Sequence, residues 1–407
     1  MKKLQKLLQA YQELALILLN TFVFLAILNI GLWGIFQIQE SFSFTSNPVS
    51  RKYGNPKLKK VYPDLSEEAM EKLLNETWSR KYIYEAFTQF KERPYSGTYV
   101  NVSLNGFRIT KNQGAWPPNR NNFNIFIFGG STTFGYGVKD EQTVASYLQE
   151  FLSNKLERNV KVYNFGRGNY YSTQELILLQ RLLVSGFIPD VAVFVDGLND
   201  FYYYNDRPLY TKRFQSFVDA EGKKESLELS LLKKLPMTKL AKFLKDRVST
   251  NLTNKEKEKE KDFDEDIYND KSLIDNIVNR YLNNKKLIEA VTAAYNVSPV
   301  FVWQPVPTYK YNLNYHLFAG NHFGKHSYSK YGYQYMAKLI EEKPLGDNFL
   351  WLADIQEKLQ EPLYVDKVHY SAKMNEMLAL NIANLLLESN LLMKDKKTIV
   401  DSALIKQ

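Results

Sequence analysis

Apolar residues follow different patterns along the chain, and each pattern predicts a different kind of element. An uncharged run of 23 residues, LALILLNTFVFLAILNIGLWGIF at 14–36, is long enough to cross a bilayer as a helix. Beyond about residue 120, short apolar runs alternate with segments of helical periodicity. Polar residues dominate between these two regions and again at 201–265. The chain therefore divides into an apolar N-terminal segment, a mixed region and an alternating region with one interruption.

The alternating region predicts a parallel sheet with helices on both faces. Strands are expected at NIFIF (124–128), VKVYNFG (160–166), PDVAVFVDGLND (189–200, running into a turn), SPVFVWQP (298–305) and NFLWLADI (348–355). Helices are expected at 142–156, 172–186, 266–295, 329–342 and 372–389, the last capped by Ser371. Near-continuous apolar strands that alternate with helices are typical of an α/β fold. Residues 121–392 are therefore predicted to form one α/β domain with an insertion at about 201–265, followed by a polar tail at 393–407.

Residues 37–120 are predicted to contain a linker and a helical extension. The stretch 37–60 is polar, which is typical of a linker. After it, PDLSEEAMEKLLNETW (63–78) begins with Asp64 or Ser66 as a cap, continues with acidic residues and then repeats apolar residues at helical spacing. One helix is therefore expected before the α/β domain.

Charges beside the apolar run favour one orientation in a membrane. Lys2, Lys3 and Lys6 precede it, whereas residues 37–50 contain no lysine or arginine. The positive-inside rule then places residues 1–13 in the cytoplasm and everything after residue 36 in the periplasm or outside the cell. A cleaved signal peptide is the alternative, but the run is long and QIQESFSFTS contains no small-x-small cleavage site. We therefore expect an uncleaved, single-pass membrane anchor.

The amino-acid composition excludes several kinds of functional site. The chain has no cysteine, which excludes disulfides, thiolate metal sites and cysteine nucleophiles. The net charge is +9, but the basic residues are dispersed and many lie in the mixed-charge run KEKEKEKD, so no nucleic-acid partner is predicted. His316, His322 and His326 share one loop without a nearby carboxylate or cysteine, so we expect a loop beside a cleft and no metal or other cofactor.

Four polar turns follow predicted strands or lie near the end of the chain: GGSTT, NFGRGN, GLND and DKVH. The carboxyl ends of parallel strands meet at one edge of a sheet, where ligands bind. A serine nucleophile needs a base, and the base needs an orienting acid. Of the four histidines, His369 alone has a carboxylate nearby in sequence, Asp366. An acyl-transfer site also needs oxyanion donors, for which the Ser131 N–H, the Asn199 amide and the backbone of the GRGN turn are candidates.

These four blocks together resemble the SGNH (GDSL-type) hydrolase family, in order and spacing, over residues 124–389. The resemblance implies a three-layer α/β/α, flavodoxin-like fold and ester hydrolysis through an acyl-serine intermediate. It assigns Ser131 as the nucleophile, His369 as the base and Asp366 as the partner of the base. It also assigns Asn199 as an oxyanion donor, beside the Ser131 N–H already considered.

The chain departs from the family pattern at two positions. Gly130 replaces the aspartate that precedes the serine in the family. Counted from Asn164, the glycine of the second block falls on Asn169, whereas Gly168 lies one residue earlier. Either residue can donate a backbone N–H, so both remain candidates.

Other motifs do not fit the turn at Ser131. The P-loop requires a lysine before its Ser or Thr, and neither G-x-G-x-x-G nor G-x-S-x-G is present there. Near the other turns, Arg167 either contacts an anionic substrate or braces its turn. Asp200 is expected to cap a helix, and Asp196 to be structural. The tyrosine-rich stretch FYYYND (201–206) either lines the cleft or forms an exposed loop.

We therefore expect a membrane-anchored serine esterase acting on an ester-bearing small molecule or an acylated glycan, including carbohydrate O-deacetylation. Two alternatives remain open. One is an O-acyltransferase that modifies a cell-envelope polysaccharide with the same residues. The other is a non-catalytic glycan-assembly protein on the same fold.

Overall fold

Buried apolar strands form a five-stranded parallel sheet in the computed structural model of the chain. Its strands are β5 (Phe123–Gly129), β6 (Val160–Asn164), β7 (Val191–Asp196), β8 (Ser298–Trp303) and β9 (Phe349–Trp351). Their order is β6-β5-β7-β8-β9, and Ile125 pairs with Val162 on one side and Val191 on the other. Renumbered along the chain this order is 2-1-3-4-5, that of flavodoxin-like folds. The predicted fold class is confirmed.

The structure describes residues 2–43, 48–220, 235–238, 240–241 and 265–389. It divides the chain into two units, which we describe separately. The first comprises Met1–Ser46 with Arg213–Asp264, and the second Asn47–Lys212 with Glu265–Gln407. The second unit contains the sheet.

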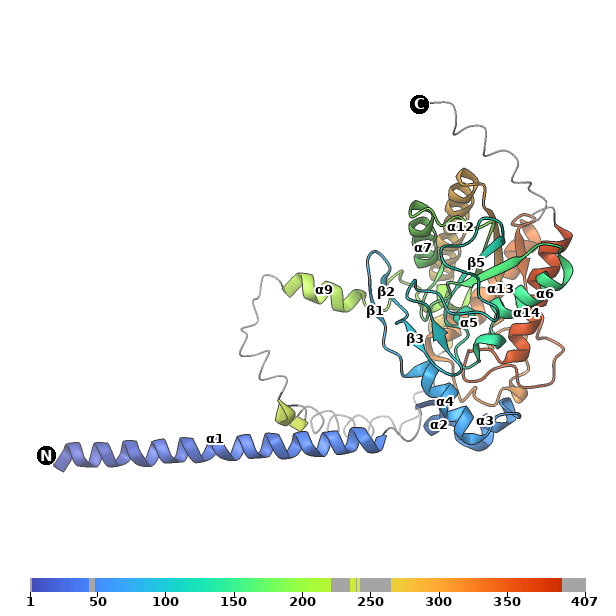
Figure 1. The fold of residues 1–407 in the computed structure, drawn as a ribbon. Helices are drawn as coiled ribbons and strands as arrows, with labels where there is room; N and C mark the ends of the chain where they lie inside the picture. Colours follow the sequence, from blue (N-terminus) through green and yellow to red (C-terminus); the bar gives the residue numbers. More distant parts are fainter. Residues whose placement is uncertain (1, 44–47, 221–234, 239, 242–264, 390–407) are drawn as a thin grey trace. The chain divides into compact units, whose positions relative to one another are not determined.

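Helices cover both faces of the sheet, which gives the three layers (Figure 1). The main helices are α6 (Val144–Lys155), α7 (Ser172–Val184), α12 (Lys271–Ala294), α13 (Tyr328–Glu342) and α14 (Ala372–Glu388). Alternate residues of β5 face opposite layers, since side chains of a strand alternate. Ile125 and Ile127 pack with α6 and α14, whereas Phe126 and Phe128 pack with α7 and α12.

The helix signals read from the sequence have the expected local chemistry. Ser371 caps α14 by accepting a hydrogen bond from the Met374 N–H at 3.4 Å. Ser66 caps α4 (Glu67–Trp78) in the same way from the Ala69 N–H at 3.1 Å. Of the two capping residues considered for α4, the structure therefore selects Ser66.

Residues 37–60 differ from the expected linker. Here α1 (Lys2–Ser43) continues to residue 43, and the short helices α2 (Pro48–Tyr53) and α3 (Asn55–Val61) follow. The physical reason is burial, because Leu58 is fully buried and packs in one cluster with Met70 and Leu74 of α4. Burial of Leu58 thus packs α3 against α4.

The extension also contains two short antiparallel pairs that the sequence did not predict. Strands β1 (Ile83–Glu85) and β2 (Gln89–Lys91) form one pair, and β3 (Tyr95–Ser96) and β4 (Asn101–Val102) form the other. Strands of two or three residues are too short to show a periodic signal. Tyr82 and Glu92, which flank the first pair, reach the functional site described below.

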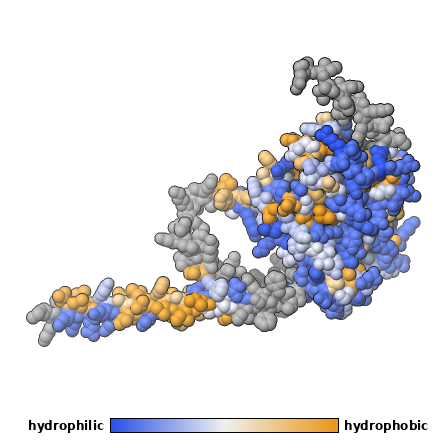
Figure 2. All heavy atoms as spheres, in the orientation of Figure 1, coloured by the Kyte–Doolittle hydropathy of each residue, from blue (hydrophilic) through white to orange (hydrophobic). Residues whose placement is uncertain are grey.

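In the first unit, α1 is long and apolar enough to span a membrane, as an anchor or a signal sequence would be. Its span Leu4–Gln37 is not buried by other parts of the protein, and Figure 2 shows apolar residues along it.

The expected insertion is described in part. It includes the end of α8 (Leu198–Tyr202), α9 (Thr211–Ala220) and a 3-10 turn that starts at Glu265. The remainder of the insertion and the tail expected at 393–407 lie outside the described residues.

Candidate active site

Ser131 lies where β5 ends and the four-residue helix α5 (Ser131–Phe134) begins. The glycine before it is required by close approach, because a Cβ on Gly130 would lie 2.4 Å from Nδ2 of Asn199. The missing side chain at residue 130 therefore lets the Asn199 amide approach the serine turn. This gives a physical account of the departure from the family pattern at this position.

Ser131, His369 and Asp366 form a continuous hydrogen-bonded series. The Oγ of Ser131 lies 2.8 Å from Nε2 of His369, and Nδ1 of His369 lies 2.7 Å from Oδ2 of Asp366. Both distances are within hydrogen-bond reach. With Asp366 ionised, Nδ1 carries a proton and its N–H donates a hydrogen bond to the carboxylate, which leaves Nε2 able to accept a hydrogen bond from the Ser131 hydroxyl.

The backbone fixes the Asp366 carboxylate as well. Its Oδ1 accepts hydrogen bonds from the N–H groups of Val368 and His369, both at 2.9 Å. Burial acts to raise the pKa of Asp366, but the charge of His369 and these hydrogen bonds outweigh it and lower the pKa to about 2. The carboxylate is therefore ionised at neutral pH.

The imidazole of His369 is held between two aromatic rings. Tyr136 stacks on it with a centroid distance of 5.3 Å, and Trp78 contacts it edge-on at 5.9 Å. Trp78 comes from the end of α4, in the N-terminal extension. These rings restrict the imidazole to the plane in which it meets both Ser131 and Asp366.

Asn199 lies in α8, beside the serine turn. Its Nδ2 donates one hydrogen to the carbonyl of Tyr170 at 2.7 Å. The second hydrogen of the same amide is not used in that bond. Asp200, next to it, accepts from the Gly197 N–H at 3.2 Å and from the Ser172 hydroxyl at 2.5 Å, so it caps the start of α8 as expected.

The two candidates of the second block differ in their hydrogen bonds. The Gly168 N–H donates to Oε1 of Glu92 at 2.9 Å. The Asn169 N–H makes no hydrogen bond within the described part of the chain. Asn169 has a φ of 65°, a left-handed conformation that glycine and asparagine adopt most readily. An asparagine therefore occupies a backbone position that also suits a glycine.

Arg167 braces its turn. It is buried, pairs with Glu85 and donates to the Tyr170 hydroxyl at 2.9 Å. Its backbone N–H donates to the carbonyl of Gly129 at 2.9 Å, which ties the turn to the end of β5. Of the two roles considered for Arg167, contact with an anionic substrate and stabilisation of its turn, these contacts fit the second.

A cavity of about 320 Å³ opens over Ser131. It is lined by aromatic rings, amides and two histidines, and none of the described residues on its wall is a carboxylate. The lining residues are Trp78, Arg80, Tyr82, Ser131, Tyr136, Asn169, Asn199, Tyr202, His326, Val368 and His369. Of the stretch FYYYND, Tyr202 is the residue that reaches the cavity, so this tyrosine-rich segment contributes one ring to it.

The three loop histidines have separate environments. His326 lines the cavity and packs on Tyr202 with a centroid distance of 4.6 Å. Burial, followed by the charge of His369, lowers the pKa of His326 to about 4, so this ring is neutral at neutral pH. His316 is buried and accepts the Phe318 N–H at Nδ1, so its Nε2 donates to the carbonyl of Lys367 at 3.1 Å. His322 is exposed, and its carbonyl accepts from Lys367.

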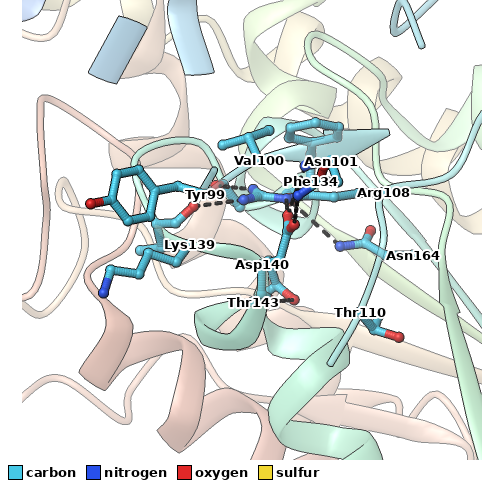
Figure 3. Close-up of polar contacts among 12 residues, drawn as sticks. Tyr99, Val100, Asn101, Arg108, Thr110, Phe134, Lys139, Asp140, Thr143 and Asn164 are labelled. Atoms are coloured by element: carbon cyan, nitrogen blue, oxygen red, sulfur yellow. Dashed lines mark hydrogen bonds and ion pairs between the residues drawn. The ribbon is translucent and has the colours of Figure 1, made fainter. Parts of the chain in front are cut away.

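The far end of α5 is held by Arg108, which is fully buried (Figure 3). Its guanidinium pairs with Asp140 at 2.9 Å and donates to the carbonyls of Phe134 at 2.9 Å and Val138 at 2.6 Å. The carbonyl oxygens at the end of a helix have no partner within the helix. Arg108 supplies one for the helix that carries Ser131, and thereby fixes the C-terminal end of that helix.

Sequence reasoning did not identify the residues that the extension brings to the cavity. Trp78 carried only a helical apolar signal, and Arg80 and Tyr82 belong to no motif. Tyr136 lies three residues after the GGSTT block (129–133), and this proximity was the one signal that pointed to it.

The sheet is parallel and doubly wound, and ligands bind at the carboxyl edge of such sheets. The four blocks, which contain Ser131, the turn at Gly168 and Asn169, Asn199 and His369, meet there, and together they define an SGNH-type hydrolase fold. The chain belongs to the GDSL-like lipase/acylhydrolase family, whose model matches residues 127–376. No curated protein matches the chain.

Similar solved structures include a putative lipolytic protein of the G-D-S-L family from Desulfitobacterium hafniense DCB-2. It is 13% identical, with a TM-score of 0.34, over 65% of this chain and 100% of that one. The esterase EstA from Pseudoalteromonas sp. is 13% identical, with a TM-score of 0.34, over 66% of this chain and 98% of that one. The acetyl xylan esterase AlAXEase is 14% identical, with a TM-score of 0.35, over 64% and 98%. The family assignment rests on the match to the family model.

Proposed function

We propose that this protein is a serine-dependent ester hydrolase in which Ser131 is the nucleophile, His369 the base and Asp366 the partner of the base. The observation that carries the proposal is the series of contacts from Ser131 Oγ to His369 Nε2 at 2.8 Å and from His369 Nδ1 to Asp366 at 2.7 Å. A serine hydroxyl is a weak nucleophile unless a positioned base removes its proton. The arrangement supplies that base and fixes its tautomer.

In the first half-reaction, His369 Nε2 takes the Ser131 proton while Oγ attacks the ester carbonyl carbon. The tetrahedral intermediate then collapses, the carbon–oxygen bond to the alcohol breaks, and the alcohol leaves with the proton from His369. In the second half, water gives a proton to His369 and attacks the acyl-serine. Ser131 regains that proton as the carboxylic acid leaves. Asp366 stabilises the imidazolium formed in each half.

The oxyanion of each tetrahedral intermediate needs donors at its position. We propose the Ser131 N–H, the free hydrogen of the Asn199 amide and the Asn169 N–H. The Gly168 N–H is already bonded to Glu92, which supports Asn169 in preference to Gly168 as the donor of the second block.

The cavity supports a short acyl group on a polar alcohol as substrate. Its volume of about 320 Å³ is at the lower end of the range of small-molecule sites, about 300–1,000 Å³. Aromatic rings from Trp78, Tyr82 and Tyr202 provide faces for sugar rings, and the Asn169 and Asn199 amides provide hydrogen bonds. We therefore propose an acylated glycan, and O-deacetylation as the reaction.

We also propose that α1 anchors the protein with residues 1–13 in the cytoplasm, so that residues 37–120 and the hydrolase-like domain at 121–392 lie outside it. An acylated envelope glycan would then be on the same side of the membrane as the cavity.

Ser131→Ala tests the proposal. It should abolish turnover of a short-chain aryl ester and labelling by an active-serine phosphonate, while circular dichroism and the unfolding midpoint stay unchanged. Thr132→Val is a matched control, because Thr132 follows Ser131 in α5 but bonds to Gln304 at 2.8 Å and not to His369. Unchanged turnover in Ser131→Ala would contradict the mechanism. Acetate release compared with acetyl transfer to an added glycan separates hydrolysis from transfer.

A further inference from the structure

Glu92, which lies outside the residues matched by the family model, holds the turn at Gly168 and Asn169. Its Oε1 accepts the Gly168 N–H at 2.9 Å and the Tyr136 hydroxyl at 3.1 Å. Its Oε2 pairs with Nη1 of Arg80 at 2.9 Å. Glu92 is 1% exposed, so a carboxylate from the extension is buried in direct contact with the active-site turn.

The same carboxylate sets the direction of a hydrogen-bonded series that reaches the Asn169 side chain. The Tyr136 hydroxyl donates its one hydrogen to Glu92, so the Tyr136 oxygen is left to accept from the Tyr82 hydroxyl. The hydroxyls of Tyr82 and Tyr136 are 3.1 Å apart. The Tyr82 oxygen in turn accepts from Nδ2 of Asn169 at 2.9 Å. Every bond therefore points from Asn169 towards Glu92.

The other end of the Asn169 side chain is also fixed, since the Tyr203 hydroxyl donates to its Oδ1 at 2.9 Å. Both polar atoms of the side chain are thus held, and the backbone of Asn169 is held in its left-handed conformation. Buried hydrogen-bonded networks of this kind are rigid when every member is satisfied. The one N–H of this turn without a hydrogen bond in the described structure is that of Asn169.

Glu92 also affects His369, the proposed base, through its hydrogen bond from the Tyr136 hydroxyl. The Tyr136 ring stacks on His369, so the hydroxyl bond to Glu92 orients a ring that restrains the imidazole. One carboxylate therefore connects the oxyanion turn with the packing of the base.

We infer that Glu92 is a positioning residue of the active site, which fixes the turn that presents the Asn169 N–H to the oxyanion and orients Tyr136 against His369. This inference rests on the proposed ester hydrolysis. It assigns a role in the reaction to the N-terminal extension, which supplies Glu92, Arg80 and Tyr82.

Glu92→Gln tests the inference, because an amide accepts hydrogen bonds at one end only. Its NH₂ group would face either Arg80 or the Gly168 N–H and the Tyr136 hydroxyl, and each of these contacts is between two donors. The kcat per folded molecule should fall by roughly 10- to 100-fold, as for a displaced oxyanion donor, while KM changes by less than about threefold. A boronic acid that forms a tetrahedral adduct with Ser131 should lose affinity in parallel with kcat/KM. Hydrogen exchange of the peptide covering residues 166–170 should become faster.

Glu76→Gln is the matched control. Glu76 is also a buried carboxylate of the extension, but it accepts from the N–H groups of Thr98, Tyr99 and Val100 and does not line the cavity. It should lower stability and leave kcat per folded molecule, boronate affinity and exchange at 166–170 unchanged. A structural role alone would make Glu92→Gln behave like this control.

The two proposals can fail separately, because hydrogen exchange does not depend on turnover. A wild-type protein that hydrolyses no ester and takes no phosphonate at Ser131 contradicts the proposed function. A Glu92→Gln variant with the kcat of the control, or with unchanged exchange at 166–170, overturns the inference.

Discussion

Ser131 Oγ and His369 Nε2 lie 2.8 Å apart, although 238 positions of the chain separate them. Other residues hold both side chains in place. Arg108 fixes the helix of Ser131, and Asp366 with Tyr136 fixes the ring of His369. The proposed proton transfer would then need little rearrangement of these side chains, as efficient general-base catalysis requires.

Asp366→Asn should lower kcat by about 10²- to 10⁴-fold with little change in KM. The Asn Oδ1 would keep the two backbone hydrogen bonds of Asp366, so its Nδ2 would face His369 Nδ1. That donor favours the tautomer with the proton on Nε2, which cannot accept from Ser131. Steady-state kinetics with an aryl ester measures the loss, and an active variant with a normal kcat would contradict this role of Asp366.

The pKa of Asp366 also predicts an effect on stability in acid. Because its pKa is lowered to about 2 in the folded state, the folded protein binds fewer protons than the unfolded chain below the usual carboxyl range. The stability contributed by Asp366 is therefore complete above about pH 4 and is lost as the pH falls towards about 2. Urea unfolding at about pH 3 and about pH 5 should show a smaller acid loss in Asp366→Asn than in the wild type.

Gly130→Ala should disable the Asn199 amide by contact. The new Cβ would lie 2.4 Å from Asn199 Nδ2, so the amide must move. We expect kcat to fall by about 10- to 10³-fold, as in Asn199→Ala. The double variant should lose no more than either single variant, because both changes remove one donor. Additive losses in this cycle would show that Gly130 acts through something other than Asn199.

Glu175 and Asp196 predict that stability falls as the pH rises. Both are fully buried, and their carboxyl oxygens find no hydrogen-bond donor among the described residues except the proton that the pair can share. Burial, then the charges of the neighbouring carboxylates, raises both pKa values well above the usual range. The folded state therefore binds more protons than the unfolded chain above about pH 4.5, and each further rise in pH favours unfolding until the pair has ionised.

Glu175→Gln should flatten this dependence, measured as the free energy of unfolding in urea from about pH 5 to about pH 9. Glu150→Gln, at an exposed ion pair with Lys111, should leave the slope unchanged. The same slope in Glu175→Gln and the wild type would rule out ionisation of the Glu175–Asp196 pair as its cause.

An uncleaved anchor predicts a chain of full mass that stays in the membrane after an alkaline wash. The absence of cysteine permits a direct test of orientation. A cysteine at the exposed Leu104 should react with a membrane-impermeant maleimide in intact cells, whereas a cysteine at Lys3 should react only after lysis. A shortened, washable chain would instead identify the apolar run as a signal peptide.

The sheet could be predicted because its strands are buried on both faces and read as apolar runs, as at Phe123–Gly129. The serine, asparagine and histidine blocks could be located because each follows such a strand or lies in the terminal block. The structure brings Ser131, Asp366 and His369 together, and their roles in a reaction remain predictions. Gly168 and Asn169 could not be separated by counting, since the bond from Gly168 to Glu92 depends on a contact between distant segments.

The extension was harder to predict, for physical reasons. Residues 37–60 are polar, and the few apolar ones that bury, such as Leu58, give no periodic pattern. Glu92 is a single acid in an irregular stretch, and its importance lies in what it touches. Burial of a polar group by tertiary contact leaves no mark in local sequence.

The segment that carries Arg108 also lies along the outer strand of the sheet. The Arg108 N–H donates to the carbonyl of Asn164 at 2.8 Å, and the Thr110 hydroxyl donates to that of Val162 at 3.1 Å, both on β6. An uncovered edge strand is a template for aggregation, and proteins commonly protect such edges with a covering segment or by keeping them short. Here one edge is covered, and the other, β9, is three residues long. A fragment that begins at residue 122, just before β5, would expose β6 and should associate through that strand.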